Sequence, residues 1–250
     1  MSKGSKDLWT GVNQAARSAL VSRDYSDDTL ADRLAGAGVA AAELIDQKHG
    51  SSETRQIWIP GVEIFPRTIH RQRHRGVFGE FAREEEGILA EIGLWPKQWA
   101  TARMFAQTAK GFHVHPPSIP ENTSAAVWQR RVFEEEADNY GLRRYDHEQW
   151  DVMFFVQGRV EMILRDVREG LQPRTMRFYI DGDNHPGSNN VGVVIPAGVA
   201  HALRVEGSED AIMVYGTSTP FHPEFEGRIA SEVETADLPA SWREFLGLRD

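Results

Sequence analysis

Short β-rich runs begin after Ser51, within a region from about Glu53 to Phe245 that we expect to form one β domain, and this pattern limits the fold more than any other feature of the sequence. Gly, Pro, Asn or Asp punctuates most of the runs, as in sheets whose strands are joined by turns. We expect strands in the segments QIWIP, VEIFPRTIH, GVFGEF, TARMFAQT, GFHVH, VMFFVQG, VEMILRDV, TMRFYIDG, VGVVIPAG, HALRVEG and AIMVYGT. No helical pattern of comparable strength alternates with them, which argues against a parallel α/β architecture. The sequence therefore predicts an all-β domain of the sandwich or jelly-roll kind.

The region before these runs, residues 1–52, is predicted to be a helical extension. Leu30, Leu34, Ala41 and Ile45 lie near one face at helical spacing. We expect an amphipathic helix or helix pair that packs on the β domain or on a partner subunit.

The predicted β domain, residues 53–250, contains one segment of different character. Residues 116–148 begin with prolines and continue with many charged residues, which indicates an insertion between two strands. An insertion of this length forms a lid, a dimer contact or a passive surface loop, and the sequence leaves these alternatives open. The C-terminal segment SWREFLGL predicts a short closing helix.

The charge balance argues against a broad surface for a nucleic-acid polymer. The 250-residue chain has a formal net charge of −9 at pH 7, whereas such a surface needs clustered Lys and Arg. The basic cluster within residues 67–75 fits either one small anion or a solvated strand or turn.

No run of apolar residues is long enough to predict a membrane span. The first residues contain no continuous apolar region typical of a signal peptide. The chain also has no cysteine, which is compatible with a reducing compartment. We therefore expect a cytoplasmic protein without membrane contacts.

Four polar residues in the β-rich region form a candidate site. His113 and His115 are two positions apart, so their side chains point to the same face of a strand. Asp151 opens a later strand that ends at a glycine, and His201 follows a turn that contains Pro and Gly.

These residues resemble the two motifs of the cupin superfamily, a His-x-His pair with a later acidic residue and a Pro-x-Gly-x-x-His turn. The resemblance implies a cupin-type jelly-roll β-barrel. In metal-binding cupins the positions of His113, His115, Asp151 and His201 hold a divalent ion, and three imidazoles with one carboxylate suit Fe, Zn, Ni or Mn. Asp151 replaces the more usual Glu.

A second resemblance covers roughly residues 60–229 and is to the dTDP-4-dehydrorhamnose 3,5-epimerase family, which also has the cupin fold. The segments RGVFGEF, KGFH, LRDVREG, VIPAGVAHAL and YGTSTPFHPEFEGRI carry it, in this order. The resemblance implies that His113 is the base that removes the proton beside the 4-keto group of a sugar. Tyr215 would return a proton on the opposite face, and His201 would lie near the developing enolate oxygen. A free imidazole has a pKa of about 6.5, which suits the proposed base.

The same resemblance implies contacts with a sugar nucleotide. Arg75 and Lys110 occupy positions where the family has arginines that contact the diphosphate. Gln98 matches a nucleotide-contacting position, and Phe221 stands where the family has tyrosine.

Asp151 departs from the epimerase pattern, because the family has a lysine near the enolate at this position. A carboxylate there would repel the enolate unless a metal ion lay between them. Together with His115, which the metal-free family normally lacks, Asp151 indicates a metal site. A ligated His113 could not also act as a base, because its lone pair would be occupied.

Three functions follow, and the first is the one that the sequence favours. It is an isomerase of the epimerase type, which needs no cofactor and acts on a sugar-like small molecule such as a nucleotide sugar. The alternatives are a metal-dependent cupin enzyme (dioxygenase, lyase or isomerase) and a non-catalytic cupin that binds a small molecule. We expect a homodimer, because the epimerase family commonly pairs its barrels.

Overall fold

The computed structural model describes residues 32–33, 58–113, 115, 149–166, 174–187 and 189–221. In this part of the chain the fold is mostly β, and every strand pair is antiparallel. The predicted helical extension, the insertion at 116–148 and the C-terminal helix lie outside the described residues, apart from Asp32 and Arg33. No helix among the described residues is long and apolar enough to cross a membrane.

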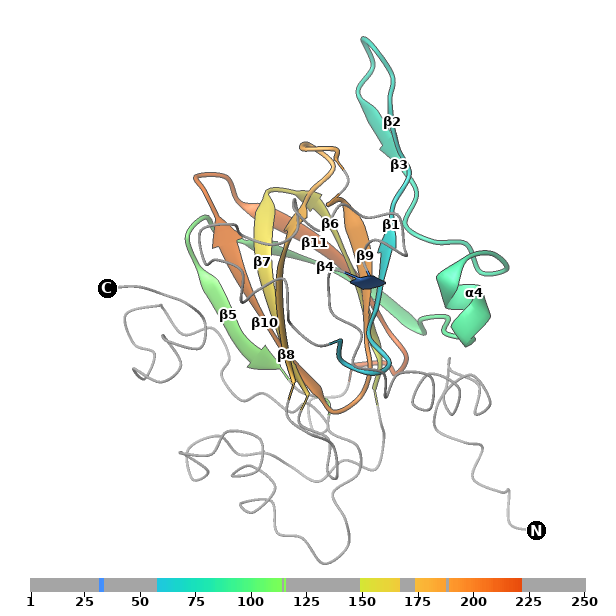
Figure 1. The fold of residues 1–250 in the computed structure, drawn as a ribbon. Helices are drawn as coiled ribbons and strands as arrows, with labels where there is room; N and C mark the ends of the chain where they lie inside the picture. The colour runs from blue at the N-terminus through green and yellow to red at the C-terminus, as the bar shows by residue number, and fades with distance from the viewer. Residues whose placement is uncertain are drawn as a thin grey trace, which may run out of the picture.

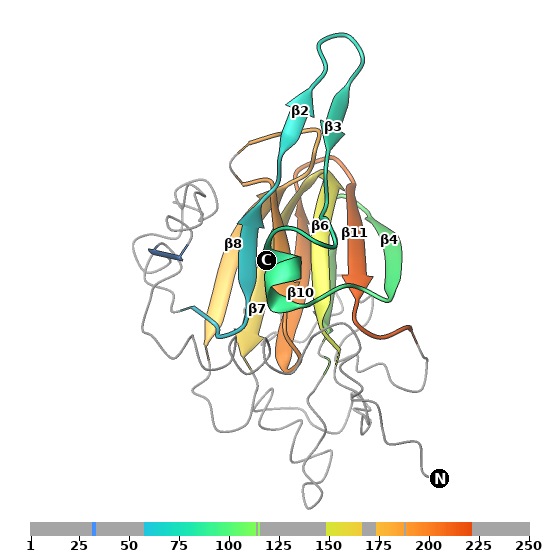
Figure 2. The same cartoon turned by 90° about the vertical axis from the view of Figure 1, so that its right-hand side faces the viewer.

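Two sheets face each other across an apolar core (Figures 1 and 2). The five-stranded sheet contains, in spatial order, β1 (Glu63–Pro66), β9 (Val191–Ile195), β6 (Asp151–Gln157), β11 (Ala211–Thr217) and β4 (Gln98–Met104). The four-stranded sheet contains β5 (Ala109–His113), β10 (Val199–Glu206), β7 (Arg159–Asp166) and β8 (Thr175–Asp181). This arrangement confirms the predicted all-β class.

The core between the sheets follows from the alternation of side chains along each strand. Val160, Met162 and Leu164 of β7 point inward and are fully buried. Met176, Phe178 and Ile180 of β8 do the same from the neighbouring strand.

A short helix, α4 (Ile88–Ile92), which the sequence patterns did not predict, covers the outer face of the five-stranded sheet. Leu89 and Ile92 are buried there in an apolar cluster with Trp150 and Phe154. The helix ends at Gly93, whose φ of 68° is the left-handed conformation that glycine adopts without steric cost.

The predicted run QIWIP is wrong as a strand over its described part, residues 58–60. Pro60 has no N–H to donate, and Gly61 at φ 84° turns the chain so that the Val62 N–H donates to the carbonyl of Ile59. The chain from 58 to 62 is therefore a turn that enters β1.

A hairpin of β2 (Ile69–Arg71) and β3 (Val77–Gly79) projects from the sandwich (Figure 1). Arg67 at its base has a buried guanidinium that pairs with Asp183 at 2.5 Å and donates to the side chain of Asn190 at 3.1 Å. These contacts lie at the Gln157 end of β6, opposite the end where Asp151 begins the strand. The hairpin is thus anchored at the far end of the sandwich from the candidate site.

Candidate functional site

The turn before β10 places His201 inside the sandwich. Gly198 has a φ of 80°, and the Val199 N–H donates to the carbonyl of Pro196 across the turn. The Gly198 N–H also donates to the carbonyl of His115 at 2.7 Å, which ties the two predicted motifs together through the backbone. His201 follows two residues after this turn and is only 3% exposed.

Strand pairing brings the two predicted histidines of β5 and β10 together. His113 lies opposite His201 in the β5–β10 register, and the two imidazole rings stack at 5.6 Å between centroids. His115 lies just beyond the end of β5, and the centroid of its ring is 6.1 Å from that of His201. The prediction that these three imidazoles converge is consistent with the structure.

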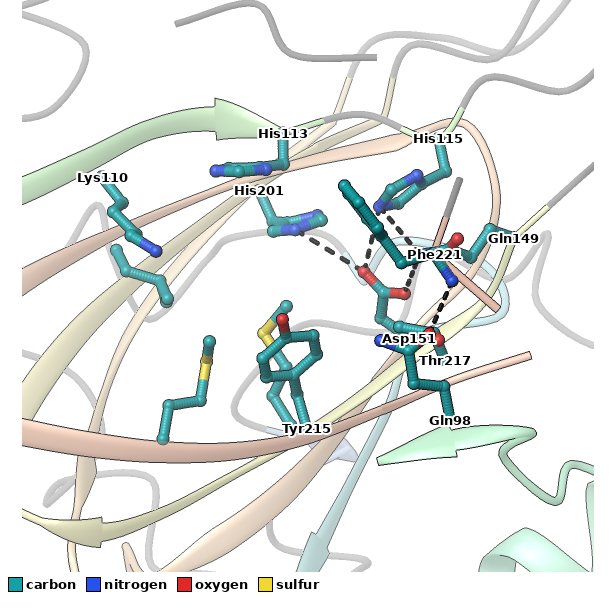
Figure 3. A pocket seen from close by; sticks show the side chains of 13 residues that line it. Gln98, Lys110, His113, His115, Gln149, Asp151, His201, Tyr215, Thr217 and Phe221 are labelled. Atoms are coloured by element: carbon teal, nitrogen blue, oxygen red, sulfur yellow. Dashed lines mark hydrogen bonds and ion pairs between the residues drawn. The ribbon is translucent and has the colours of Figure 1, made fainter. Parts of the chain in front are cut away.

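Asp151 joins them from the opposite sheet, as the first residue of β6. Its Oδ2 lies 3.3 Å from Nε2 of His115 and 3.8 Å from Nε2 of His201 (Figure 3). Its Oδ1 accepts a hydrogen bond from the amide nitrogen of Gln149 at 2.8 Å. Asp151 is 3% exposed, so these neighbours replace most of the hydration of its carboxylate.

Burial and charge act on Asp151 in opposite directions. Burial alone would raise the pKa of Asp151, but Coulombic attraction to His115 and His201, with hydrogen bonds from His115 and Gln149, outweighs burial and lowers the pKa to about 2. The carboxylate is therefore ionised at neutral pH.

Burial dominates at His201 instead. It lowers the pKa of the His201 imidazole to about 4, although the negative charge of Asp151 partly opposes the shift. His201 is therefore neutral at neutral pH, and its Nδ1 lies 3.5 Å from the carbonyl of Val199, at the outer limit of a hydrogen bond.

The four residues open into one pocket at this end of the sandwich (Figure 3). Tyr215 of β11 lines it from the five-stranded sheet, while Lys110 and His113 line it from the four-stranded sheet. Apolar side chains of both sheets complete the wall: Met153, Leu203 and Met213.

Two further predicted residues, Gln98 and Phe221, also line this pocket. They are joined directly, because the backbone N–H of Phe221 donates to the side-chain oxygen of Gln98 at 2.6 Å. Phe221 is 51% exposed, which leaves its ring available to a ligand.

Arg75 does not line the pocket of its own chain. It lies in the turn of the β2–β3 hairpin, where its N–H donates to the carbonyl of Gln72, at the other end of the sandwich. The predicted contact of Arg75 with a diphosphate therefore has no support within a single chain.

Sequence reasoning missed Gln149, Thr217 and the apolar wall. Gln149 had a signal, because it stands two residues before Asp151 and alternation places both side chains on one face. The methionines of the wall had none, since an apolar residue on a strand is ordinarily core.

Three of the four predicted metal ligands lie close enough to share an ion. One donor atom each from His115, Asp151 and His201 lies within 4.8 Å of the others, whereas His113 is not in this group of described residues. Zn–ligand bonds of about 2.0–2.2 Å separate neighbouring donor atoms by about 3–3.5 Å, close to the 3.3 and 3.8 Å measured here. The donor set of the three residues fits a divalent ion.

Comparison with known proteins gave one curated relative, and no family model matches the chain. The relative is the spore coat polysaccharide biosynthesis protein SpsL of Bacillus subtilis (strain 168), which is 25% identical over 180 residues. The match covers 71% of this chain and 93% of SpsL.

Among solved structures, similar folds include the epimerase RmlC of Legionella pneumophila in complex with dTDP-4-keto-L-rhamnose, at 21% identity and a TM-score of 0.47, covering 68% of this chain and 73% of that one. Another is ChmJ, a 3'-monoepimerase of Streptomyces bikiniensis in complex with dTDP-quinovose, at 19% identity and a TM-score of 0.49. The match covers 77% of this chain and 90% of ChmJ. Both of these solved structures are epimerases by name, and the likeness of this chain to them concerns the fold.

Proposed function

We propose that the protein is an isomerase that inverts a carbon beside the ketone of a nucleotide-linked sugar. His113 is the base that removes the proton, and Tyr215 is the acid that returns one. The resemblance of the sequence segments supports the substrate class, and the pocket supports the reaction type.

The observation that carries the proposal is the position of base and acid on opposite walls. His113 belongs to the four-stranded sheet and Tyr215 to the five-stranded sheet, and both line the same pocket (Figure 3). A planar enolate held between the walls would lose a proton to one side and gain one from the other, which inverts the carbon.

The remaining polar groups suit this chemistry. His201 lies beside His113 and, being neutral, can donate one hydrogen bond from its pocket-facing Nε2 to the enolate oxygen when the proton is on that nitrogen. Lys110 supplies a cation on the same side of the pocket, suited to an anionic part of the substrate.

The test is solvent exchange on a dTDP-linked 4-keto-6-deoxy sugar in D₂O, followed by NMR. Wild-type protein should introduce deuterium beside the ketone, and His113→Asn should slow this by roughly 10²–10⁴-fold, the usual contribution of a general base. The exposed His185 provides a matched control, His185→Asn, which should leave the rate unchanged. Absence of exchange with wild-type protein, or full activity of His113→Asn, would refute the proposal.

A second candidate is a metal-dependent enzyme, and the convergence of His115, Asp151 and His201 favours it specifically. A divalent ion of the Fe, Zn, Ni or Mn kind would act as a Lewis acid on the substrate oxygen. His201 would then carry its proton on Nδ1, towards the Val199 carbonyl, a common arrangement around metal-binding histidines. His113 lies outside the group of three, so it stays available as a base under this candidate as well.

Metal analysis separates the two candidates. Protein purified without an affinity tag should contain about one ion per chain under the second candidate, and Asp151→Asn should lose it while His113→Asn keeps it. Metal content near zero, even after divalent metals are added back, would rule the second candidate out.

A further inference from the structure

The side chain of Gln149 lies between two members of the site and is held from behind by a third residue. Its Nε2 is 2.8 Å from Oδ1 of Asp151 and 3.1 Å from Nε2 of His115. Its Oε1 accepts a hydrogen bond from the hydroxyl of Thr219 at 2.7 Å. Gln149 is thus fixed at both ends of its amide, and Figure 3 shows its side chain beside Asp151 and His115.

The chemistry of the partners determines which way the amide faces. An ionised carboxylate can only accept hydrogen bonds, so the nitrogen of Gln149, and not its oxygen, must face Asp151. The Thr219 hydroxyl then has an acceptor in the amide oxygen and reinforces the same orientation.

Because of the contact with Gln149, the two carboxylate oxygens of Asp151 have different partners. Oδ1 is taken by the amide, while Oδ2 faces His115 at 3.3 Å and His201 at 3.8 Å. Rotation of the carboxylate about its last bond would break the 2.8 Å contact, because Oδ1 would leave the amide.

We propose that Gln149, held by Thr219, is a positioning residue that aims one oxygen of Asp151 at the two imidazoles. This inference rests on the site proposed above but not on which of the two candidate reactions occurs there. A carboxylate fixed in this way suits a bound ion, and it equally orients the imidazoles around a substrate.

Thr219 gives the arrangement a second link to the pocket. It follows β11, the strand of Tyr215, and its carbonyl accepts a hydrogen bond from the hydroxyl of Thr217 at 2.6 Å. Nearby, Ser218 and Trp150 exchange two hydrogen bonds, which fix this segment against the start of β6. The segment after β11 therefore fixes the Gln149 amide, and through it the Asp151 carboxylate.

The test replaces the amide by a side chain of similar length without an N–H donor, Gln149→Met. We expect kcat on the dTDP-linked 4-keto-6-deoxy sugar to fall about 10–100-fold with a smaller change in KM, and the affinity for Zn²⁺ alone to fall by a similar factor. Gln157→Met is the matched control, since Gln157 lies at the other end of β6, where its side chain donates to the backbone carbonyl of Asp210. The control should leave both measurements within about twofold of wild type.

Two variants of Thr219 test the outer link. Thr219→Val removes the hydroxyl and should reduce the same quantities by several-fold, whereas Thr219→Ser keeps the hydroxyl and should restore them. If Thr219 had a purely structural role, Thr219→Val would lower the melting temperature, but kcat and Zn²⁺ affinity would not differ between the valine and serine variants.

Crystal structures of wild type and Gln149→Met decide the inference even if the wild-type protein neither turns over the sugar nor binds Zn²⁺, which would remove the proposed function alone. The variant should show the Asp151 carboxylate rotated, with Oδ2 no longer facing both imidazoles. An unrotated carboxylate in the variant, or unchanged kcat and Zn²⁺ affinity in a protein that shows either property, would overturn the proposal.

Discussion

Acidification should destabilise the protein through the single imidazole of His201. Burial lowers the pKa of His201 from 6.5 to about 4, so the folded protein resists the proton that the unfolded chain accepts. As the pH falls below 6.5, proton binding favours the unfolded state, and this loss of stability is complete only below about pH 4. Stability from this group is therefore highest above pH 6.5.

The size of the effect follows from the width of that window. Each pH unit inside it costs about 1.4 kcal/mol, because one proton is bound by the unfolded state only. Between about pH 7 and about pH 5 the free energy of unfolding should fall by about 2 kcal/mol through His201 alone. The low pKa of Asp151, about 2, places its own contribution below pH 3.8, outside this range.

Urea unfolding followed by tryptophan fluorescence measures the effect, on protein treated with a chelator so that no metal competes with the proton. His201→Gln removes the titrating group and keeps a polar side chain. The difference in unfolding free energy between about pH 7 and pH 5 should be about 2 kcal/mol smaller in this variant than in wild type, because the other titrating groups cancel. Equal pH dependence in the two proteins would show that His201 is not held neutral by burial.

Three further outcomes follow from the geometry. Tyr215→Phe should still permit His113 to exchange the substrate proton for deuterium but should yield little inverted product, since the proposed proton donor on the opposite wall is missing. Equal yields of inverted product from this variant and from wild type would contradict the proposed role of Tyr215. Gly158→Ala should cost about 1–3 kcal/mol in urea unfolding, because Gly158 has a φ of 78° and a Cβ would come within 2.8 Å of the Asp210 carbonyl; a smaller cost would mean that the turn relaxes. Arg67→Met should lower the free energy of unfolding by about 3 kcal/mol, because it leaves the Asp183 carboxylate without its buried partner, and an unchanged urea midpoint would argue against this.

Local sequence patterns were sufficient for much of the fold and part of the site. Alternation along strands predicted that His113 and His115 share a face, and the Pro196–Gly198 turn predicted where His201 enters its strand. These features depend on neighbours in the sequence, which a single chain displays directly.

Contacts between distant segments were harder to anticipate. The position of Arg75 depends on the direction of the hairpin, which a buried ion pair between Arg67 and Asp183 fixes across more than a hundred residues. The role of Gln149 depends on Thr219, which joins it only after β11 has returned to β6. No local pattern encodes such pairs.

The placement of the proposed base His113 and the proposed acid Tyr215 on separate sheets has a consequence for the size of the substrate. Met153, Leu203 and Met213 line the pocket between the two walls, so their volume limits the space left for a substrate between these two residues. Methionine is flexible and fills irregular gaps. Exchanging these spacers for smaller or larger residues would widen or narrow the slot, and ring size could be selected without touching any group that handles a proton.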